Sequence, residues 1–105
     1  MEDVLEIVYI NNLYDLYKEL LTEKQRNYFE AFYLENMSLS EIADAYNVSR
    51  NAIYSQLNLV KESLYDYENK LNLLKKIEKR EKIIQKIKEK SDKDLSKLLD
   101  ELMEV

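Results

Sequence analysis

Two groups of side chains in this sequence have the types and spacing needed to bind a nucleic acid. We name the first group the reading face, and it comprises Arg50, Asn51, Tyr54, Ser55, Asn58 and Lys61. On a helix, Asn51, Ser55 and Asn58 share one face, and the other three residues flank it. An arginine can bind a guanine edge or a phosphate in the major groove, and an asparagine can bind an adenine edge. One interpretation is contact with duplex DNA. The other, which the net charge of -2 of the motif and the nearby Glu41, Asp44 and Glu62 favour, is a helix-turn-helix scaffold that holds other helices or a protein partner.

The second group is a row of lysines later in the chain, which we name the basic ridge: Lys75, Lys79, Lys82 and Lys86. Residues 70–91 carry nine lysines and arginines against three glutamates, a net charge of +6, whereas the whole chain carries -5. One interpretation is a solvated face, with lysines interleaved among glutamates. The other is contact with RNA phosphates or with an acidic protein surface. Membrane-surface binding is disfavoured because the apolar side of this segment lacks aromatic anchors.

The composition excludes most catalytic chemistry. The chain has no cysteine and no histidine, which removes disulfides, zinc sites and nucleophiles activated by histidine. Carboxylates and tyrosines are present, but no spacing brings them together in a catalytic or metal site. We therefore predict a protein that is not an enzyme and that uses no cofactor and no metal.

The absence of glycine and proline makes helix the expected state of nearly every residue, so the fold class is all-α. Capping boxes at Thr22 and Ser38 predict two helix starts, since glutamine or glutamate follows each three residues later. The segment Glu41–Leu57 then has helix-turn-helix spacing. Its inward positions are Ile42, Ala43, Val48, Ile53 and Leu57, with a turn at Asn47 and a cap at Ser49.

Apolar periodicity predicts the helices that support this motif. The first spans residues 4–21, with one buried face formed by Leu5, Tyr9, Leu13, Leu16, Tyr17 and Leu20. Its tyrosines, Tyr9, Tyr14 and Tyr17, should have buried rings and hydrated hydroxyls. The second spans about residues 23–35 and carries the aromatic cluster Tyr28, Phe29, Phe32, Tyr33 and Leu34. We interpret this cluster as core, and a stacking platform for unpaired bases is the alternative.

The third helix should span about residues 39–46, and the fourth should run from Ser49 to about Leu74, burying Ile53, Leu57, Val60 and Leu64. We place a domain boundary between residues 69 and 70, where the composition turns basic. The resulting domains are residues 1–69, an N-terminal helix plus helix-turn-helix, and residues 70–105, a basic helical arm and a leucine-striped final helix.

The arm has unpaired apolar residues. Leu73, Ile77, Ile84 and Ile87 approximate a short heptad seam that Arg80 interrupts. Ser91 should cap a last helix whose leucines, Leu95, Leu98, Leu99 and Leu102, share one face. This face either folds back onto the preceding helix or forms an exposed patch. We predict a homodimer formed mainly by the helices after Leu64.

The middle of the chain resembles known sequences. The run LLTEKQRNYFEAFYLENMSLSEIADAYNVSRNAIYSQL is similar to the promoter-reading helix-turn-helix of bacterial sigma factors (region 4). With the tyrosine-rich first helix and the continuation SLYDYENKLNLL, it is similar to the YlxM-like family of small bacterial proteins over about residues 4–75.

That resemblance implies an accessory or regulatory role in the signal recognition particle pathway, with the particle's GTPase or RNA as partner. The alternative is a sequence-specific DNA-binding transcription regulator. The acidic start of the chain and the lack of a long apolar run predict a cytoplasmic protein that does not insert into membranes.

Overall fold

The computed structural model describes residues 2–104, and every regular element in that range is helical. The predicted all-α fold with a helix-turn-helix is therefore confirmed. The chain divides into two compact units, Met1–Leu71 and Asn72–Val105. The first unit contains the helix-turn-helix, and the second contains the basic ridge.

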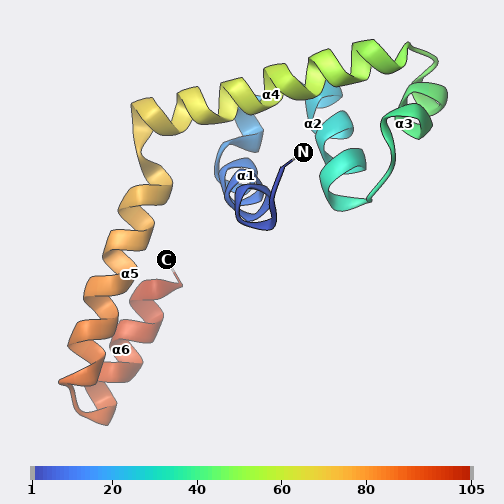
Figure 1. The fold of residues 1–105 in the computed structure, drawn as a ribbon. Helices are drawn as coiled ribbons and strands as arrows, with labels where there is room; N and C mark the ends of the chain where they lie inside the picture. The colour runs from blue at the N-terminus through green and yellow to red at the C-terminus, as the bar shows by residue number, and fades with distance from the viewer. Residues whose placement is uncertain (1, 105) are drawn as a thin grey trace. The chain divides into compact units, whose positions relative to one another are not determined.

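In the first unit, the long helix α4 (Arg50–Leu71) packs against three shorter helices (Figure 1). These are α1 (Val4–Tyr17), α2 (Glu23–Phe29) and α3 (Leu39–Tyr46). The predicted inward face of α4 is confirmed, because Ile53, Val60 and Leu64 are fully buried and Leu57 is 5% exposed. One side of α4 is therefore buried in the core, and its other side lies at the surface.

Caps set the ends of these helices. The hydroxyls of Thr22 and Ser38 accept hydrogen bonds from the amides of Gln25 (3.1 Å) and Glu41 (3.0 Å), and both reciprocal bonds are present. Helix α3 ends at Asn47, which has φ 55° and ψ 48°. Asparagine tolerates this left-handed conformation better than most residues, and it allows the Val48 amide to donate to the Ala43 carbonyl at 3.0 Å.

Not every predicted inward position of the first unit is buried. The core face of α1 consists of Ile10, Leu13, Tyr14 and Tyr17, whereas Leu5 is 81% and Leu20 55% exposed. The buried face of α1 thus begins at Ile10, and Leu20 lies in the 3-10 turn Lys18–Leu20 that follows the helix. Tyr9 and Val48 were also predicted to face inward, and both are exposed.

The aromatic cluster is confirmed as core at Tyr28 and Phe29, which are 2% and 0% exposed. The rings of Tyr14 and Phe29 stack with centroids 4.1 Å apart. After α2, the chain continues through a π-helical turn, Glu30–Leu34, which widens the helix by one residue. That turn shifts the side-chain register, and Leu34 becomes 56% exposed rather than buried as predicted.

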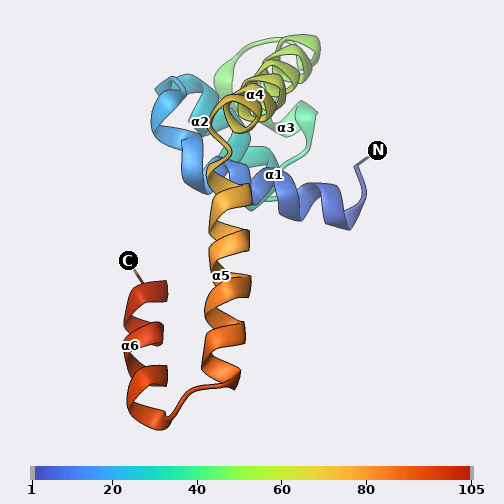
Figure 2. The ribbon, with the colours of Figure 1, turned by 90° about the vertical axis from the view of Figure 1, so that its left-hand side faces the viewer.

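In the second unit, α5 (Leu73–Glu89) and α6 (Lys93–Met103) lie side by side and antiparallel (Figure 2). Helix α4 ends before the predicted Leu74 because Asn72 adopts φ 55°. Ser91 does not cap α6, since its hydroxyl donates to the Ile87 carbonyl at the end of α5. The cap is Asp92, whose carboxylate accepts from the Leu95 amide at 2.9 Å.

Candidate nucleic-acid interface

The start of α4 presents four residues of the reading face at the surface. Arg50, Asn51 and Ser55 are exposed, and Tyr54 is 56% exposed. The helix start is fixed by Ser49, whose hydroxyl accepts from the Ala52 amide at 3.0 Å. The first turn of α4 contains no acidic residue, so the positive end of the helix dipole is not offset within that turn. This arrangement can accept a phosphate or a base edge.

The rest of the reading face is less accessible. Asn58 is half-buried. The Nζ of Lys61 lies 3.7 Å from Oε2 of Glu2, an ion pair beyond hydrogen-bond distance, and only 24% of the Lys61 side chain is exposed. Because Glu2 offsets the charge of Lys61, this lysine attracts a phosphate more weakly than its position on the helix predicts.

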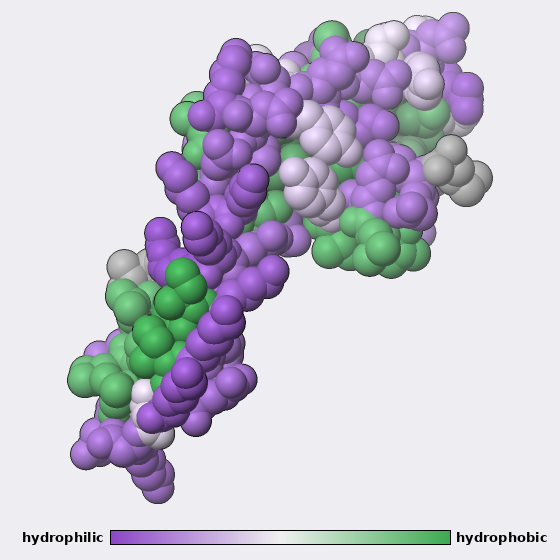
Figure 3. All heavy atoms as spheres, turned by 60° about the vertical axis from the view of Figure 1, so that its left-hand side comes forward, coloured by the Kyte–Doolittle hydropathy of each residue, from purple (hydrophilic) through white to green (hydrophobic). Residues whose placement is uncertain are grey.

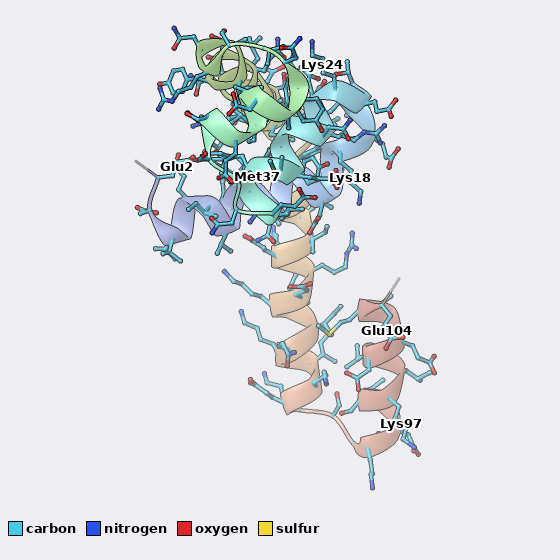
Figure 4. All side chains as sticks on the ribbon, turned by 90° about the vertical axis from the view of Figure 1, so that its right-hand side faces the viewer. Glu2, Lys18, Lys24, Met37, Lys97 and Glu104 are labelled. Atoms are coloured by element: carbon cyan, nitrogen blue, oxygen red, sulfur yellow. The ribbon has the colours of Figure 1, made fainter. Side chains whose placement is uncertain are left out.

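Glu2 takes part in a small polar cluster that the sequence did not reveal. The hydroxyl of Tyr33 donates to Oε1 of Glu2 at 2.5 Å. Burial, then the hydrogen bond and charge of Glu2, raise the pKa of Tyr33 far above its usual 10. Glu2 and Met37 line one hollow of about 420 Å³ (Figure 4). These contacts attach the start of the chain to the helix-turn-helix.

A second polar contact lies in the core. The hydroxyl of Tyr17 donates to Oε1 of Glu68 at 2.6 Å, and the two residues are 1% and 7% exposed. The prediction of a hydrated hydroxyl is therefore wrong for Tyr17. It is also wrong for Tyr14, whose hydroxyl oxygen is buried. Burial, and then the charge of Glu30, raise the pKa of Tyr14 to about 12. Glu68 follows the buried Leu64 by four residues, so helical spacing in the sequence already placed Glu68 on the buried face of α4.

The basic ridge lies on α5 in the second unit. Lys75, Lys79, Lys82 and Lys86 are all exposed, as their common side of the helix predicts. Lys82 and Lys86 also line a shallow hollow of about 470 Å³ together with Glu78, Glu81, Gln85, Glu89 and Met103. The ridge therefore has carboxylates along one edge, which weaken its field on that side.

Within residues 2–104, no three acidic side chains come together in a way that could hold a metal ion. No helix in the described part of the chain is long and apolar enough to cross a bilayer.

The fold and the capped α3–turn–α4 arrangement define the class of the protein: an all-helical helix-turn-helix protein. Residues 4–103 match the family model described as "Putative helix-turn-helix protein, YlxM / p13 like". The chain belongs to this family, UPF0122, and the resemblance recognised in the sequence is confirmed.

Named relatives agree with this assignment. The UPF0122 protein BH2485 of Halalkalibacterium halodurans is 49% identical over 80% of this chain and 77% of its own length. The UPF0122 protein GK1195 of Geobacillus kaustophilus is 44% identical over 91% of this chain and 93% of its own. The UPF0122 protein OB1530 of Oceanobacillus iheyensis is 49% identical over 75% of each chain.

Proposed function

We propose that this protein is a non-enzymatic, cytoplasmic accessory or regulatory protein of the signal recognition particle pathway, and that it binds the particle's RNA through the basic ridge. Membership of the YlxM-like family supports the pathway, as the resemblance implied. The observation that carries the binding mode is the row of exposed lysines on α5: Lys75, Lys79, Lys82 and Lys86. The particle's GTPase is the protein partner that the same resemblance favours.

Charge distribution favours the ridge over the reading face. Phosphate contacts supply most of the affinity of a nucleic-acid-binding protein, and each neutralised phosphate adds to it. The ridge offers four lysines on one side of a helix. The reading face offers Arg50 and Lys61, and Lys61 is already paired with Glu2. Because the A-form major groove is too narrow for side chains to read, lysines that contact the RNA backbone suit this ligand better than a recognition helix does.

The test is binding of signal-recognition-particle RNA, by fluorescence anisotropy, to the parent and to a variant with all four ridge lysines replaced by glutamate. The four positions are exposed, so the helical circular dichroism of the variant should match that of the parent. We expect RNA affinity to fall by at least about a hundredfold, since eight units of charge are reversed. The matched control replaces four lysines outside the ridge by glutamate and so changes the net charge equally: Lys18, Lys24, Lys93 and Lys97. Equal affinity of the ridge variant and the parent would refute the proposal.

A second candidate function, sequence-specific DNA binding, is favoured by the exposed start of α4. Arg50, Asn51, Tyr54 and Ser55 form a surface that fits the major groove. This candidate predicts that Arg50→Ala with Asn51→Ala abolishes discrimination between duplex sequences, whereas the ridge variant weakens all sequences alike. Selective duplex binding by the parent at physiological salt would favour this function over the first.

A further inference from the structure

The hairpin of α5 and α6 leaves an apolar face uncovered within the second unit. Five side chains contribute to it, with these exposed fractions: Ile83 48%, Ile87 41%, Leu95 42%, Leu98 60% and Leu102 50%. Ile84 and Leu99 are buried beneath them and hold the two helices together. A groove of about 370 Å³ runs along this face (Figure 3, green surface at the lower left). Exposed apolar surface of this kind marks an interaction site.

The two edges of this face carry opposite charge. On the α5 side, the groove is lined by Lys76, Lys79 and Arg80. On α6, counting about 100° per residue from the buried Leu99 places Asp94 and Glu101 next to Leu98, on the edge away from α5. Counting in the same way from the buried Ile84 places Lys79 next to Ile83, on the edge away from α6, whereas Lys76 and Arg80 lie among the apolar residues in the first half of α5. The face therefore has a basic outer edge at Lys79 and an acidic outer edge at Asp94 and Glu101.

A surface of this kind is complementary to itself. If a second copy is related by a twofold axis parallel to the helices, α5 of each copy packs antiparallel on α6 of the other. The basic edge then meets the partner's acidic edge, and the apolar residues meet in the centre. The other face-to-face arrangement, with α5 on α5, brings the lysines and arginines of both copies together and is disfavoured by repulsion.

We infer that this face is the homodimer interface, with the two hairpins forming an antiparallel four-helix bundle. Lys79 and Leu102 both line the groove. Counting in opposite directions from the buried Ile84 and Leu99 places Glu101 within about one helical turn of Lys79 along the helices, a distance that two long side chains span. In the twofold arrangement, Lys79 of one copy pairs with Glu101 of the other, and the pair occurs twice. Lys75 and Lys82 lie further round α5 and remain outside the bundle.

Sedimentation equilibrium of the full chain, without nucleic acid, tests the inference. The parent should be a dimer at tens of micromolar. Leu98→Glu, at the most exposed leucine of the face, should raise the dimer Kd at least about a hundredfold while leaving helix content unchanged. Lys79→Glu alone and Glu101→Lys alone should each raise it about tenfold. Tenfold corresponds to about 1.4 kcal/mol, or about 0.7 kcal/mol for each of two pairs at the edge of the interface.

The combined Lys79→Glu, Glu101→Lys variant reverses both charges and should restore the parent's Kd. The matched controls are Lys82→Glu, on another side of α5 from the groove, and Glu104→Lys, at the carboxyl end of α6 and on another side of it from Leu98 (Figure 4), and both should remain dimeric. A monomeric parent at tens of micromolar would overturn the inference. So would a combined variant that dimerises no better than either single one. These masses are measured without RNA, so they leave the proposed RNA-binding function unaffected.

Discussion

Removing the Tyr17 hydroxyl should destabilise the first unit measurably. In Tyr17→Phe, the Glu68 carboxylate loses the hydrogen bond that it accepts at 2.6 Å, while the ring contacts remain. Because both residues are almost fully buried, water cannot easily replace the donor. Removing one partner of a buried hydrogen bond costs about 1–3 kcal/mol. For a unit of this size, that loss should lower Tm by roughly 4–24 °C.

The chain provides its own probe and control for this measurement. All nine tyrosines lie in the first unit and tryptophan is absent, so near-ultraviolet circular dichroism of tyrosine reports on that unit alone. Tyr67→Phe is the matched control, because the Tyr67 hydroxyl makes only a long, exposed contact of 3.4 Å with the Leu20 carbonyl. It should change stability by less than about 0.5 kcal/mol. If both variants melt at the same temperature, the buried hydrogen bond does not stabilise the unit as argued.

Three further predictions concern the helix-turn-helix. Ile53→Asp should unfold it, because a charge placed at a fully buried position costs several kcal/mol. Asn51 is exposed, so Asn51→Ala should melt at the same temperature as the parent. Equal melting temperatures of the two variants would contradict the assigned faces of α4. Asn47→Ala should lower the free energy of unfolding by about 1 kcal/mol and Asn47→Gly should not, since φ is 55° at this position. Chemical denaturation measures both values. An alanine variant as stable as the parent would argue against the left-handed turn. The hydrogen bonds with Ser38 lower the pKa of Glu41 below its usual 4.5, so its stabilising contribution is present above that value and is lost as the pH falls through the lowered pKa. The stability difference between the parent and Glu41→Gln should therefore shrink in acid, and a difference independent of pH would contradict the capping box.

The sequence predicted the helix-turn-helix accurately because its signals are local. The boxes at Thr22 and Ser38 depend on residues only three positions apart, and the turn at Asn47 depends on one residue's backbone preference. The buried face of α4 follows from a regular spacing over four apolar residues. These features are determined within one or two helical turns, so tertiary contacts did not change them.

Long-range contacts explain the features that were missed. Lys61 is paired with Glu2, and Tyr17 with Glu68, across 59 and 51 positions of sequence, and spacing along one helix does not reveal such partners. Leu5 has helical spacing but is 81% exposed, because the face of α1 that packs on the core is formed by Ile10, Leu13, Tyr14 and Tyr17. Ser91 was predicted to cap α6, but Asp92 does so. The Ser91 hydroxyl instead donates to the Ile87 carbonyl at the end of α5, a contact that the sequence did not reveal.

The salt dependence of RNA binding tests the central claim most directly. The Kd of the parent for signal-recognition-particle RNA should rise steeply with salt, with a logarithmic slope that corresponds to about three neutralised phosphates, because Lys79 pairs with Glu101 in the inferred dimer and three ridge lysines remain for the RNA. Replacing Lys75, Lys79, Lys82 and Lys86 by glutamate should remove most of that slope, and the Arg50→Ala, Asn51→Ala variant should keep it. A slope that survives reversal of the ridge, or that disappears with Arg50 and Asn51, would contradict the account.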